Sequence, residues 1–374
     1  MLKVMTIVGT RPELIKMSRV IAELDKYTKH VLVHTGQNHD YELNQVFFDE
    51  LEIRKPDYFL SAAGRNAAQT IAQVISKVDE TLEAEAPQAV LLYGDTNSCL
   101  SIIAAKRRQI PVFHMEAGNR CFDQRVPEEL NRKVLDHLAD INLVLTEHAR
   151  RYLIAEGIRP ETIIKTGSHM REVLDYHLPR IRRSDVLRRL GLESERYFLA
   201  SIHREENVDS AESLEQLLAC LDALVEAYSL PVMVSTHPRT RRRLAERGQG
   251  NVRKEITFHP PFGFLDYVHL QMHALCVLSD SGTITEETAL LNLRSVIVRN
   301  THERPEGMDA GTLIMSGLRK ERIVDTVKTI VAQWSPDGPA VLPVDDYENP
   351  HVSAQIVRIV SSYVDYVNRT VWSK

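Results

Sequence analysis

Carboxylates gather where short apolar runs of this sequence end. Asp95 and Glu116 each follow such a run, and Glu128 opens a helical stretch directly after Pro127. Carboxylates placed on both faces of one substrate can remove a proton on one side and return it on the other. A single carboxylate would more often be a helix cap or a solvated side chain. Several of them near strand ends favour a reactive site.

Cationic side chains occupy equivalent positions. Arg11 and Lys16 lie in GTRPELIK after the first apolar run, Arg132 follows Glu128 by one helical turn, and His203 begins HREENVD after another apolar run. An arginine can bind a diphosphate through two parallel N–H donors, although Arg11 could equally cap a surface helix. Histidine can donate to a phosphate or transfer a proton. Arg304, in the stretch NTHERPEG after the last clear strand, adds one more cation.

The stretch VLSDSGTITEE, Val277–Glu287, turns from an apolar run into a helix through Ser281 and Gly282. A helix that begins there directs free backbone N–H groups and positive partial charge at its ligand, which suits a phosphate. Glu286 and Glu287 come one turn later, and one of them could accept hydrogen bonds from hydroxyls such as a ribose diol. The alternative is an ordinary capped helix, with Thr283 as the cap and Glu286 as its capping-box partner.

Several kinds of chemistry have no motif in the sequence. It contains no GxGxxG fingerprint, no Walker-A loop and no GxSxG elbow, and His269 and His273 lack the companions of a zinc site. We therefore expect no metal and no cofactor. The net charge of −5 argues against a nucleic-acid partner. A nucleotide-diphosphate sugar fits best, handled by an acid/base enzyme, by a glycosyltransferase or by a non-catalytic sensor.

Short apolar runs alternate with amphipathic stretches, which predicts two doubly wound α/β domains. The expected strands of the first are Leu2–Val8, His30–His34, Ala89–Tyr93, Val112–Met115, Asn142–Leu145 and Thr162–Lys165, and those of the second are Tyr197–Ile202, Pro231–Ser235, Ile256–Phe258, Ala274–Ser279 and Ser295–Val298. We expect a first domain over 1–168 and a second over 169–351. The final helical stretch, 352–374, is expected to pack back on the first.

The composition predicts a cytoplasmic protein. An apolar share of 43% and a charged share of 26% are typical of globular chains, and no apolar run reaches membrane-spanning length, so we expect no membrane insertion. MLKVMTIVG leads into a strand and does not have the pattern of a signal peptide. The four cysteines form no close pair, which indicates reduced thiols.

The motifs together resemble the non-hydrolysing UDP-N-acetylglucosamine 2-epimerases, a family with two Rossmann-like domains of the glycosyltransferase-B type that face a cleft. The matching stretches are GTRPELIK, GDTNS, HMEAGNR, PEELNR, HREENVD, SDSGTITEE and HERPEG. HTGQNHDYELN, AGNRCFDQRVPEE, VSTHPRT and SYVDYVNRTVW are closer to one branch, the enzymes that make UDP-N-acetyl-L-fucosamine from UDP-2-acetamido-2,6-dideoxy-L-talose for surface polysaccharides.

The resemblance implies elimination of UDP to a 2-acetamidoglycal, followed by re-addition. It implies Asp95, Glu116 and Glu128 as acid/base groups and His203 as help for the leaving group. The diphosphate would be bound by Arg11, Ser281 and Gly282, and the ribose by Glu287, with Lys16 and Arg132 as supporting charges. Arg304 is also expected to bind the substrate. We expect the protein to form a homodimer. The stretch GQNHDYELNQ departs from the better-known bacterial members, where this region belongs to a regulatory site, so activation by UDP-N-acetylglucosamine is not implied.

Overall fold

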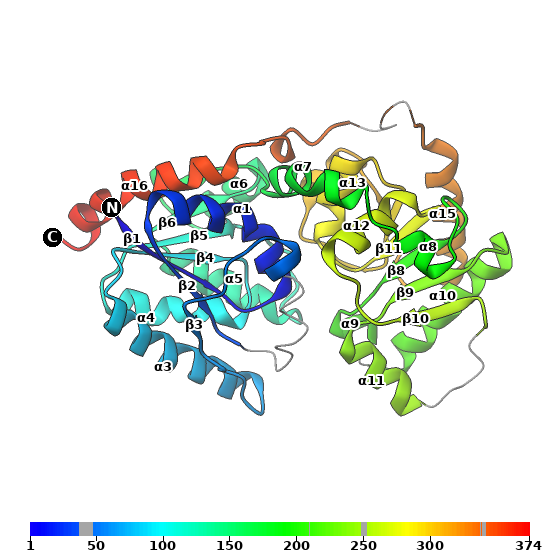
Figure 1. Ribbon diagram of the computed structural model, residues 1–374, viewed down its shortest axis with the longest axis horizontal. Helices are drawn as coiled ribbons and strands as arrows, with labels where there is room; N and C mark the ends of the chain where they lie inside the picture. Colours follow the sequence, from blue (N-terminus) through cyan, green and yellow to red (C-terminus); the bar gives the residue numbers. More distant parts are fainter. Residues whose placement is uncertain (37–47, 209, 248–252, 337, 339–341) are drawn as a thin grey trace. The chain divides into compact units, whose positions relative to one another are not determined.

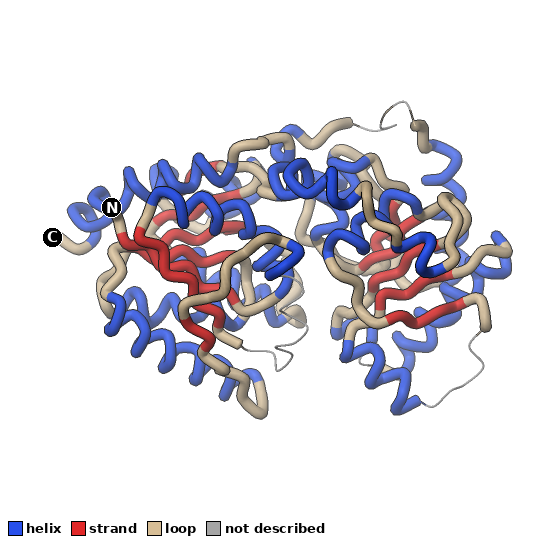
Figure 2. The backbone as a smooth tube through the Cα atoms, viewed as in Figure 1, coloured by secondary structure: helices blue, strands red, loops and turns tan. Residues whose placement is uncertain are grey.

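The computed structural model describes residues 1–36, 48–208, 210–247, 253–336, 338 and 342–374, and the chain divides into two units (Figure 1). Unit 1 comprises Met1–Tyr176 and Asp346–Lys374, and unit 2 comprises His177–Asp345. In each unit, helices flank a sheet of parallel strands (Figure 2). The predicted fold class, two Rossmann-like doubly wound domains, is confirmed.

The sheet of unit 1 has seven parallel strands in the order β3-β2-β1-β4-β5-β6-β7. β1 pairs with β2 on one side, from Lys3 opposite Lys29 to Val8 opposite His34, and with β4 on the other. Its strands are β1 (Lys3–Val8), β2 (Lys29–His34), β3 (Tyr58–Phe59), β4 (Ala89–Tyr93), β5 (Val112–Ala117), β6 (Ile141–Val144) and β7 (Ile163–Lys165). The order reverses between β1 and β4, which makes that edge a topological switch point.

Helices cover both faces of this sheet (Figure 1). One face carries α1 (Arg11–Tyr27), against which the C-terminal helix α16 (Val352–Val371) packs; the other carries α3 (Ala67–Glu85), α4 (Ile102–Arg107) and α5 (Pro127–Leu138). α6 (Glu147–Ala155) precedes β7. A fully buried Val, Leu or Ile contributes about 1.5–3 kcal/mol, so the near-continuous apolar strands hold the loops at their ends firmly.

The sheet of unit 2 repeats the arrangement with six parallel strands, in the order β10-β9-β8-β11-β12-β13. They are β8 (Phe198–Ser201), β9 (Val232–Ser235), β10 (Ile256–His259), β11 (Cys276–Ser279), β12 (Ser295–Ile297) and β13 (Ile314–Met315). Here the order reverses between β8 and β11. Phe198, Val232 and Val296 face one apolar core, and Leu199, Met233 and Ile297 face the other.

Each face of this second sheet has its own helices. α10 (Ala211–Tyr228) and α15 (Lys320–Gln333) pack on the first core, while α8 (Val186–Leu190), α12 (Phe264–His273) and α13 (Thr283–Leu291) pack on the second. The other α-helices among the described residues are α7 (Met170–Ile181), α9 (Glu205–Val208), α11 (Pro238–Arg247) and α14 (Pro305–Asp309). Among the described helices, none combines the length and the apolar content needed to cross a membrane.

The division between the units falls inside α7, after Tyr176, and again after Asp345. The sequence-based bounds lie nearby: 168 directly follows Gly167, and 351 directly precedes α16. A boundary inside a continuous helix leaves no turn signal in the sequence. The two-residue strands β3 and β13 were not predicted, since they are too short for an apolar pattern. The helical spacing of Tyr41–Leu51 also predicts a helix, and most of that stretch lies outside the described residues.

Candidate functional site

Residues with charged or reactive side chains lie at the switch points of both sheets. Arg11 follows β1 and Asp95 follows β4, while His203 follows β8 and Asp280 follows β11. Loops at the carboxyl ends of strands on either side of a switch point form the usual ligand site of this fold. The topology therefore brings together, within each unit, residues that are far apart in the sequence.

Glu116 lies where β5 is irregular. The register against β6 shifts between Met115 and Ala117, and Glu116 has a φ of 63°, in the left-handed region. Such a conformation costs a non-glycine residue about 1–2 kcal/mol and is concentrated at functional sites. The bulge directs the carboxylate to Lys16, whose Nζ lies 3.3 Å from Oε2, and to Asn119, whose side chain donates to Oε1 over 3.1 Å.

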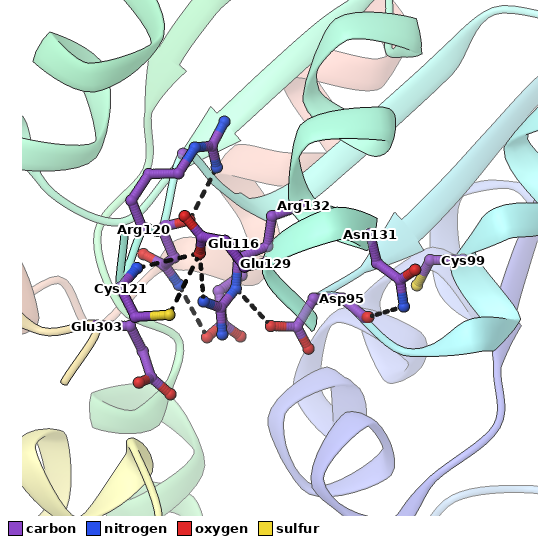
Figure 3. Close-up of polar contacts among 12 residues, drawn as sticks. Asp95, Cys99, Glu116, Arg120, Cys121, Glu129, Asn131, Arg132 and Glu303 are labelled. Carbon is purple, nitrogen blue, oxygen red and sulfur yellow. Dashed lines mark hydrogen bonds and ion pairs between the residues drawn. The ribbon is translucent and has the colours of Figure 1, made fainter. Parts of the chain in front are cut away.

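Asp95 and Arg132 form a second pair in unit 1 (Figure 3). Arg132 donates from Nε to Asp95 Oδ2 over 2.8 Å and from Nη1 to Glu129 Oε2 over 3.0 Å. Asn131 adds a hydrogen bond of 2.9 Å to the backbone carbonyl of Asp95. Arg132 is buried, so the guanidinium is a fixed positive charge beside Asp95.

The structure distinguishes the two adjacent glutamates of α5. Glu129 is buried and accepts from the backbone N–H groups of Cys121 (3.1 Å) and Phe122 (3.2 Å) as well as from Arg132. The carboxylate of Glu128 is half-buried and makes no hydrogen bond or ion pair with any described residue. Glu129 therefore fixes the loop before α5, and Glu128 is left available to a ligand.

Glu13 is a buried carboxylate that the sequence did not mark as part of a site. Its Oε2 accepts from the N–H groups of Gly9 and Thr10 (2.8 Å), and its Oε1 accepts from the hydroxyl of Thr96 over 2.6 Å. Burial raises the pKa of Glu13 to about 7, and these hydrogen bonds only partly offset that rise. The loop of Arg11, which is half-buried at the first position of α1, is thereby tied to the loop after β4.

The available signal for Glu13 was the capping box TRPE, in which Thr10 and Glu13 exchange hydrogen bonds at the start of α1. Gly9 makes the close packing possible, because a Cβ there would lie 2.0 Å from Ser98 Oγ and 2.3 Å from Thr35 Oγ1. The spacing showed the cap. It did not show that the same carboxylate would also bind Thr96, from a loop more than eighty residues away.

A buried charged network stabilises the loop after β5. His114 contacts Asp136 through Nδ1 (2.9 Å) and the carbonyl of Gly94 through Nε2 (2.7 Å); Asp136 in turn pairs with Arg120 (2.7 Å). Burial lowers the pKa of His114, but these acceptors raise it more, so it lies above its ordinary value. Gly118 allows this loop to pack closely against α6, because a Cβ there would lie 2.6 Å from the carbonyl oxygen of Ala149.

In unit 2, Asp280 is completely buried and fixes the loop after β8. Its Oδ2 accepts from the backbone N–H groups of His203 (2.9 Å) and Arg204 (2.8 Å) and from the Asn207 amide (3.0 Å). Its Oδ1 lies 3.3 Å from Nδ1 of His203, whose side chain is 40% exposed. The imidazole therefore has a buried carboxylate beside Nδ1 and is partly exposed.

The start of α13 differs from the capping box considered above. The N-cap is Gly282, which has no side chain that could cap the helix, so the Thr283–Glu286 capping box is wrong. Glu286 is buried and pairs with Arg304 over 3.0 Å. Its carboxylate therefore does not cap the first turn of α13. Ser281 Oγ accepts from the N–H of Thr283 over 3.3 Å. A Cβ on Gly282 would lie 3.0 Å from Oε1 of Glu303, so glycine leaves room for that carboxylate.

Two predicted binding residues of unit 2 have well-defined partners. Glu287, on α13, accepts from Nε2 of Gln271 over 2.7 Å, and Arg304 is buried against Glu286. Glu303, which the sequence did not single out, accepts from Arg204 (2.8 Å) and Arg299 (2.7 Å). Arginine and glutamate thus lie together around the start of α13, and among the described residues no group of three potential metal ligands occurs.

Comparisons with known proteins agree with this geometry. A family model described as UDP-N-acetylglucosamine 2-epimerase matches residues 22–361. The solved UDP-N-acetylglucosamine 2-epimerase of Rickettsia bellii is 59% identical, with a TM-score of 0.94 over 100% of both chains. The Methanocaldococcus jannaschii UDP-GlcNAc 2-epimerase, solved with UDP-GlcNAc and UDP, is 30% identical, with a TM-score of 0.89 over 96% of this chain and 100% of that one. The UDP-2,3-diacetamido-2,3-dideoxy-D-glucuronate 2-epimerase of Pseudomonas aeruginosa is 32% identical over 90% of this chain and 94% of its own.

Proposed function

Because this chain belongs to the UDP-N-acetylglucosamine 2-epimerase family and is thus a UDP-sugar 2-epimerase, an isomerase, we propose that it inverts carbon 2 of UDP-2-acetamido-2,6-dideoxy-L-talose. The product is UDP-N-acetyl-L-fucosamine, a precursor for a capsule or O-antigen. The sugar assignment rests on the branch-like stretches AGNRCFDQRVPEE, VSTHPRT and SYVDYVNRTVW. UDP-N-acetylglucosamine is the second candidate substrate, because the 59% identical relative is named as a UDP-N-acetylglucosamine 2-epimerase.

The observation that carries the chemistry is the set of partly accessible carboxylates in unit 1. Glu128 makes no pair among the described residues, Glu116 occupies a strained bulge, and the side chain of Asp95 is 28% exposed. Carbon 2 of the sugar has no adjacent carbonyl to acidify its proton. A carboxylate can remove that proton only as the bond from carbon 1 to the diphosphate oxygen breaks.

The proposed reaction balances without an added cofactor. The electrons of the C2–H bond form the C1=C2 double bond of a 2-acetamidoglycal, and UDP departs with the electrons of the C1–O bond. UDP then adds back to carbon 1 as an acid protonates carbon 2 from the opposite face. Asp95, Glu116 and Glu128 exchange the protons, while Lys16 and Arg132 stabilise the charges of their partners Glu116 and Asp95.

The nucleotide is assigned to the remaining residues. Arg11, Ser281 and Gly282 bind the diphosphate, because an arginine fork and the N-terminal N–H groups of α13 suit an anion. Glu287 accepts from the ribose, and His203 stabilises the departing phosphate. Arg304 acts through its buried ion pair with Glu286, which holds α13 in place. We also propose that the chain is a homodimer.

The deciding experiment offers the purified enzyme each candidate sugar nucleotide in deuterated water and follows both by NMR. We expect conversion of UDP-2-acetamido-2,6-dideoxy-L-talose, deuterium at carbon 2 of the product, and traces of UDP and the glycal without added NAD. Retention of the original hydrogen at carbon 2 would contradict the elimination. Efficient conversion of UDP-N-acetylglucosamine alone would replace the substrate and leave the mechanism in place. Stoichiometric release of UDP that requires an added acceptor, to which the sugar is transferred, would indicate a glycosyltransferase.

Phe122 and Val126, in the loop between Glu116 and Glu128, are the candidates for an apolar contact with the sugar's 6-methyl group. Phe122 is 69% exposed and has a φ of 56°, held by the hydrogen bond from its N–H to Glu129. Val126 is 6% exposed and therefore belongs to the packing beneath the loop. We assign the sugar contact to Phe122, since an apolar surface gives a 6-hydroxyl no partner.

A further inference from the structure

His203 and Asp280 face each other from the two strands that flank the switch point of unit 2. His203 follows β8 and Asp280 follows β11, and these strands pair in parallel from Phe198 opposite Cys276 to Ser201 opposite Ser279. Their carboxyl ends therefore meet at one edge. This register sets Nδ1 of His203 3.3 Å from Oδ1 of Asp280.

The two carboxylate oxygens of Asp280 have different surroundings. Oδ2 accepts the N–H groups of His203 and Arg204 and the amide of Asn207, which secures the loop. Oδ1 is buried and accepts no hydrogen bond within the described part of the chain. A buried carboxylate oxygen without a donor costs free energy, and the imidazole N–H is the group placed to supply one.

We propose that Asp280 is a positioning residue that holds His203 with its proton on Nδ1 and its Nε2 directed outward, and that favours the imidazolium. The proposal rests on the role proposed for His203 at the leaving diphosphate. A carboxylate behind a histidine selects the tautomer and stabilises the positive charge as it develops. The imidazolium can then donate from Nε2 to the phosphate oxygen as the C1–O bond breaks.

The titratable surroundings of His203 include one more group. The ring of His237, in the loop after β9, lies with its centroid 5.6 Å from that of His203 and tilted by 31°. Two imidazolium ions at that separation repel each other, so His237 opposes the charged form of His203 and Asp280 favours it. The carboxylate is the nearer of the two and is completely buried.

Asp280→Asn tests the proposal with little change of shape. The amide oxygen can replace Oδ2 and keep the loop secured, while the amide NH2 then faces Nδ1 and forces the other tautomer. We expect turnover of the epimerase to fall by roughly a hundredfold with little change in KM, and the limb of the pH–rate profile that reports imidazolium to move to lower pH. In ¹⁵N spectra of labelled enzyme, the neutral His203 ring should change from the Nδ1–H to the Nε2–H form.

Asn207→Ala is the matched control, because it removes two hydrogen bonds from the same loop, to Asp280 and to the carbonyl of Val298, and leaves Oδ1 opposite His203. It should leave the tautomer and the pH limb unchanged. Equal effects of both variants on the tautomer and the pH limb would show that Asp280 only stabilises the loop.

The wild-type spectrum is decisive even if Asp280→Asn does not fold. A neutral His203 with its proton on Nε2 overturns the proposal. An Nδ1–H ring in an enzyme that proved to have another activity would leave the Asp280–His203 pair standing and refute only the proposed function.

Discussion

The two units anchor their first loop in the same way but expose different chemistry beside it. In unit 1, Glu13 accepts the consecutive N–H groups of Gly9 and Thr10; in unit 2, Asp280 accepts those of His203 and Arg204. Both carboxylates are buried and follow the switch-point strands β1 and β11. A buried acceptor thus fixes the loop after the first strand in each unit.

The difference lies in the remaining carboxylates. In unit 1, Asp95 and Glu116 have side-chain exposures of 28% and 14%, and Glu128 has no partner among the described residues. In unit 2, Glu286 and Glu303 have exposures of 0% and 6% and are paired with arginines. Asp95 and Glu116 are paired with cations as well, but part of their surface stays accessible. The two buried carboxylates of unit 2 cannot readily exchange protons with a substrate. The same fold therefore presents partly accessible carboxylates in one unit and buried, arginine-paired carboxylates in the other.

The test with the largest expected effect replaces the accessible carboxylates of unit 1. Asp95→Asn, Glu116→Gln and Glu128→Gln should each lower turnover by roughly a hundredfold or more, because each removes a proposed proton-transfer group. UDP affinity, measured by calorimetry, should change little. Arg11→Ala is the contrasting variant and should weaken UDP binding, since it removes a proposed diphosphate contact. Near-normal turnover in all three carboxamide variants would show that these side chains are only structural.

The next test concerns the anchor of unit 1 and its pH dependence. The pKa of Glu13 rises from 4.5 in the unfolded chain to about 7 in the fold. Its stabilising contribution is therefore complete below pH about 4.5 and is lost as the pH rises through about 7. A shift of this size corresponds to about 3 kcal/mol. Glu13→Gln keeps an acceptor for Gly9 and Thr10 and has no charge to bury.

We expect the difference in unfolding free energy between wild type and Glu13→Gln to change by up to about 3 kcal/mol between pH 4.5 and 8, with the wild type losing stability as the pH rises. Urea unfolding at several pH values measures it. Glu23→Gln, on the same helix and paired only with Lys26 among the described residues, controls for loss of a surface carboxylate. A pH-independent difference for Glu13→Gln would mean that the carboxylate titrates normally.

The sequence predicted the strands and the residues at their ends better than it predicted which carboxylates would be buried. Apolar runs located the longer strands, and residues after them, such as Asp95 and His203, lie at the switch points because strand ends must meet there. Which of two neighbouring glutamates would be buried could not be predicted. Glu128 and Glu129 differ only in the side of α5 that they occupy, and that depends on the path of the loop over Cys121 and Phe122.

The carboxylates of unit 2 show the same limit. Glu286 matched a capping box by spacing, yet it pairs with Arg304, which arrives from the loop after β12. A local pattern of four residues does not contain a partner eighteen residues away. Long-range ion pairs of this kind decide whether a glutamate caps, anchors or remains available.

The smallest expected effect concerns Glu287, the one carboxylate of α13 assigned to the ligand. It accepts from Gln271, which places its carboxylate but leaves acceptor capacity for a ribose hydroxyl. Glu287→Gln keeps the size and one oxygen and removes the charge, so the hydrogen bond to the ribose should weaken. We expect UDP affinity to fall roughly threefold to tenfold, since a hydrogen bond to a charged group contributes about 1.5–3 kcal/mol and a neutral one about 0.5–1.5 kcal/mol.

The affinity for 2′-deoxy-UDP provides the control, because a ligand without the hydroxyl has no such hydrogen bond to lose. The wild type should prefer UDP over 2′-deoxy-UDP, and Glu287→Gln should reduce that preference, as measured by calorimetry with both nucleotides. Asp309→Asn, at the end of α14, tests for a general effect of negative charge in unit 2. If Glu287→Gln weakened both nucleotides equally, Glu287 would be a counter-ion like Glu286 and Glu303. All three carboxylates around α13 would then be structural, and the contrast between the units would be sharper than we propose.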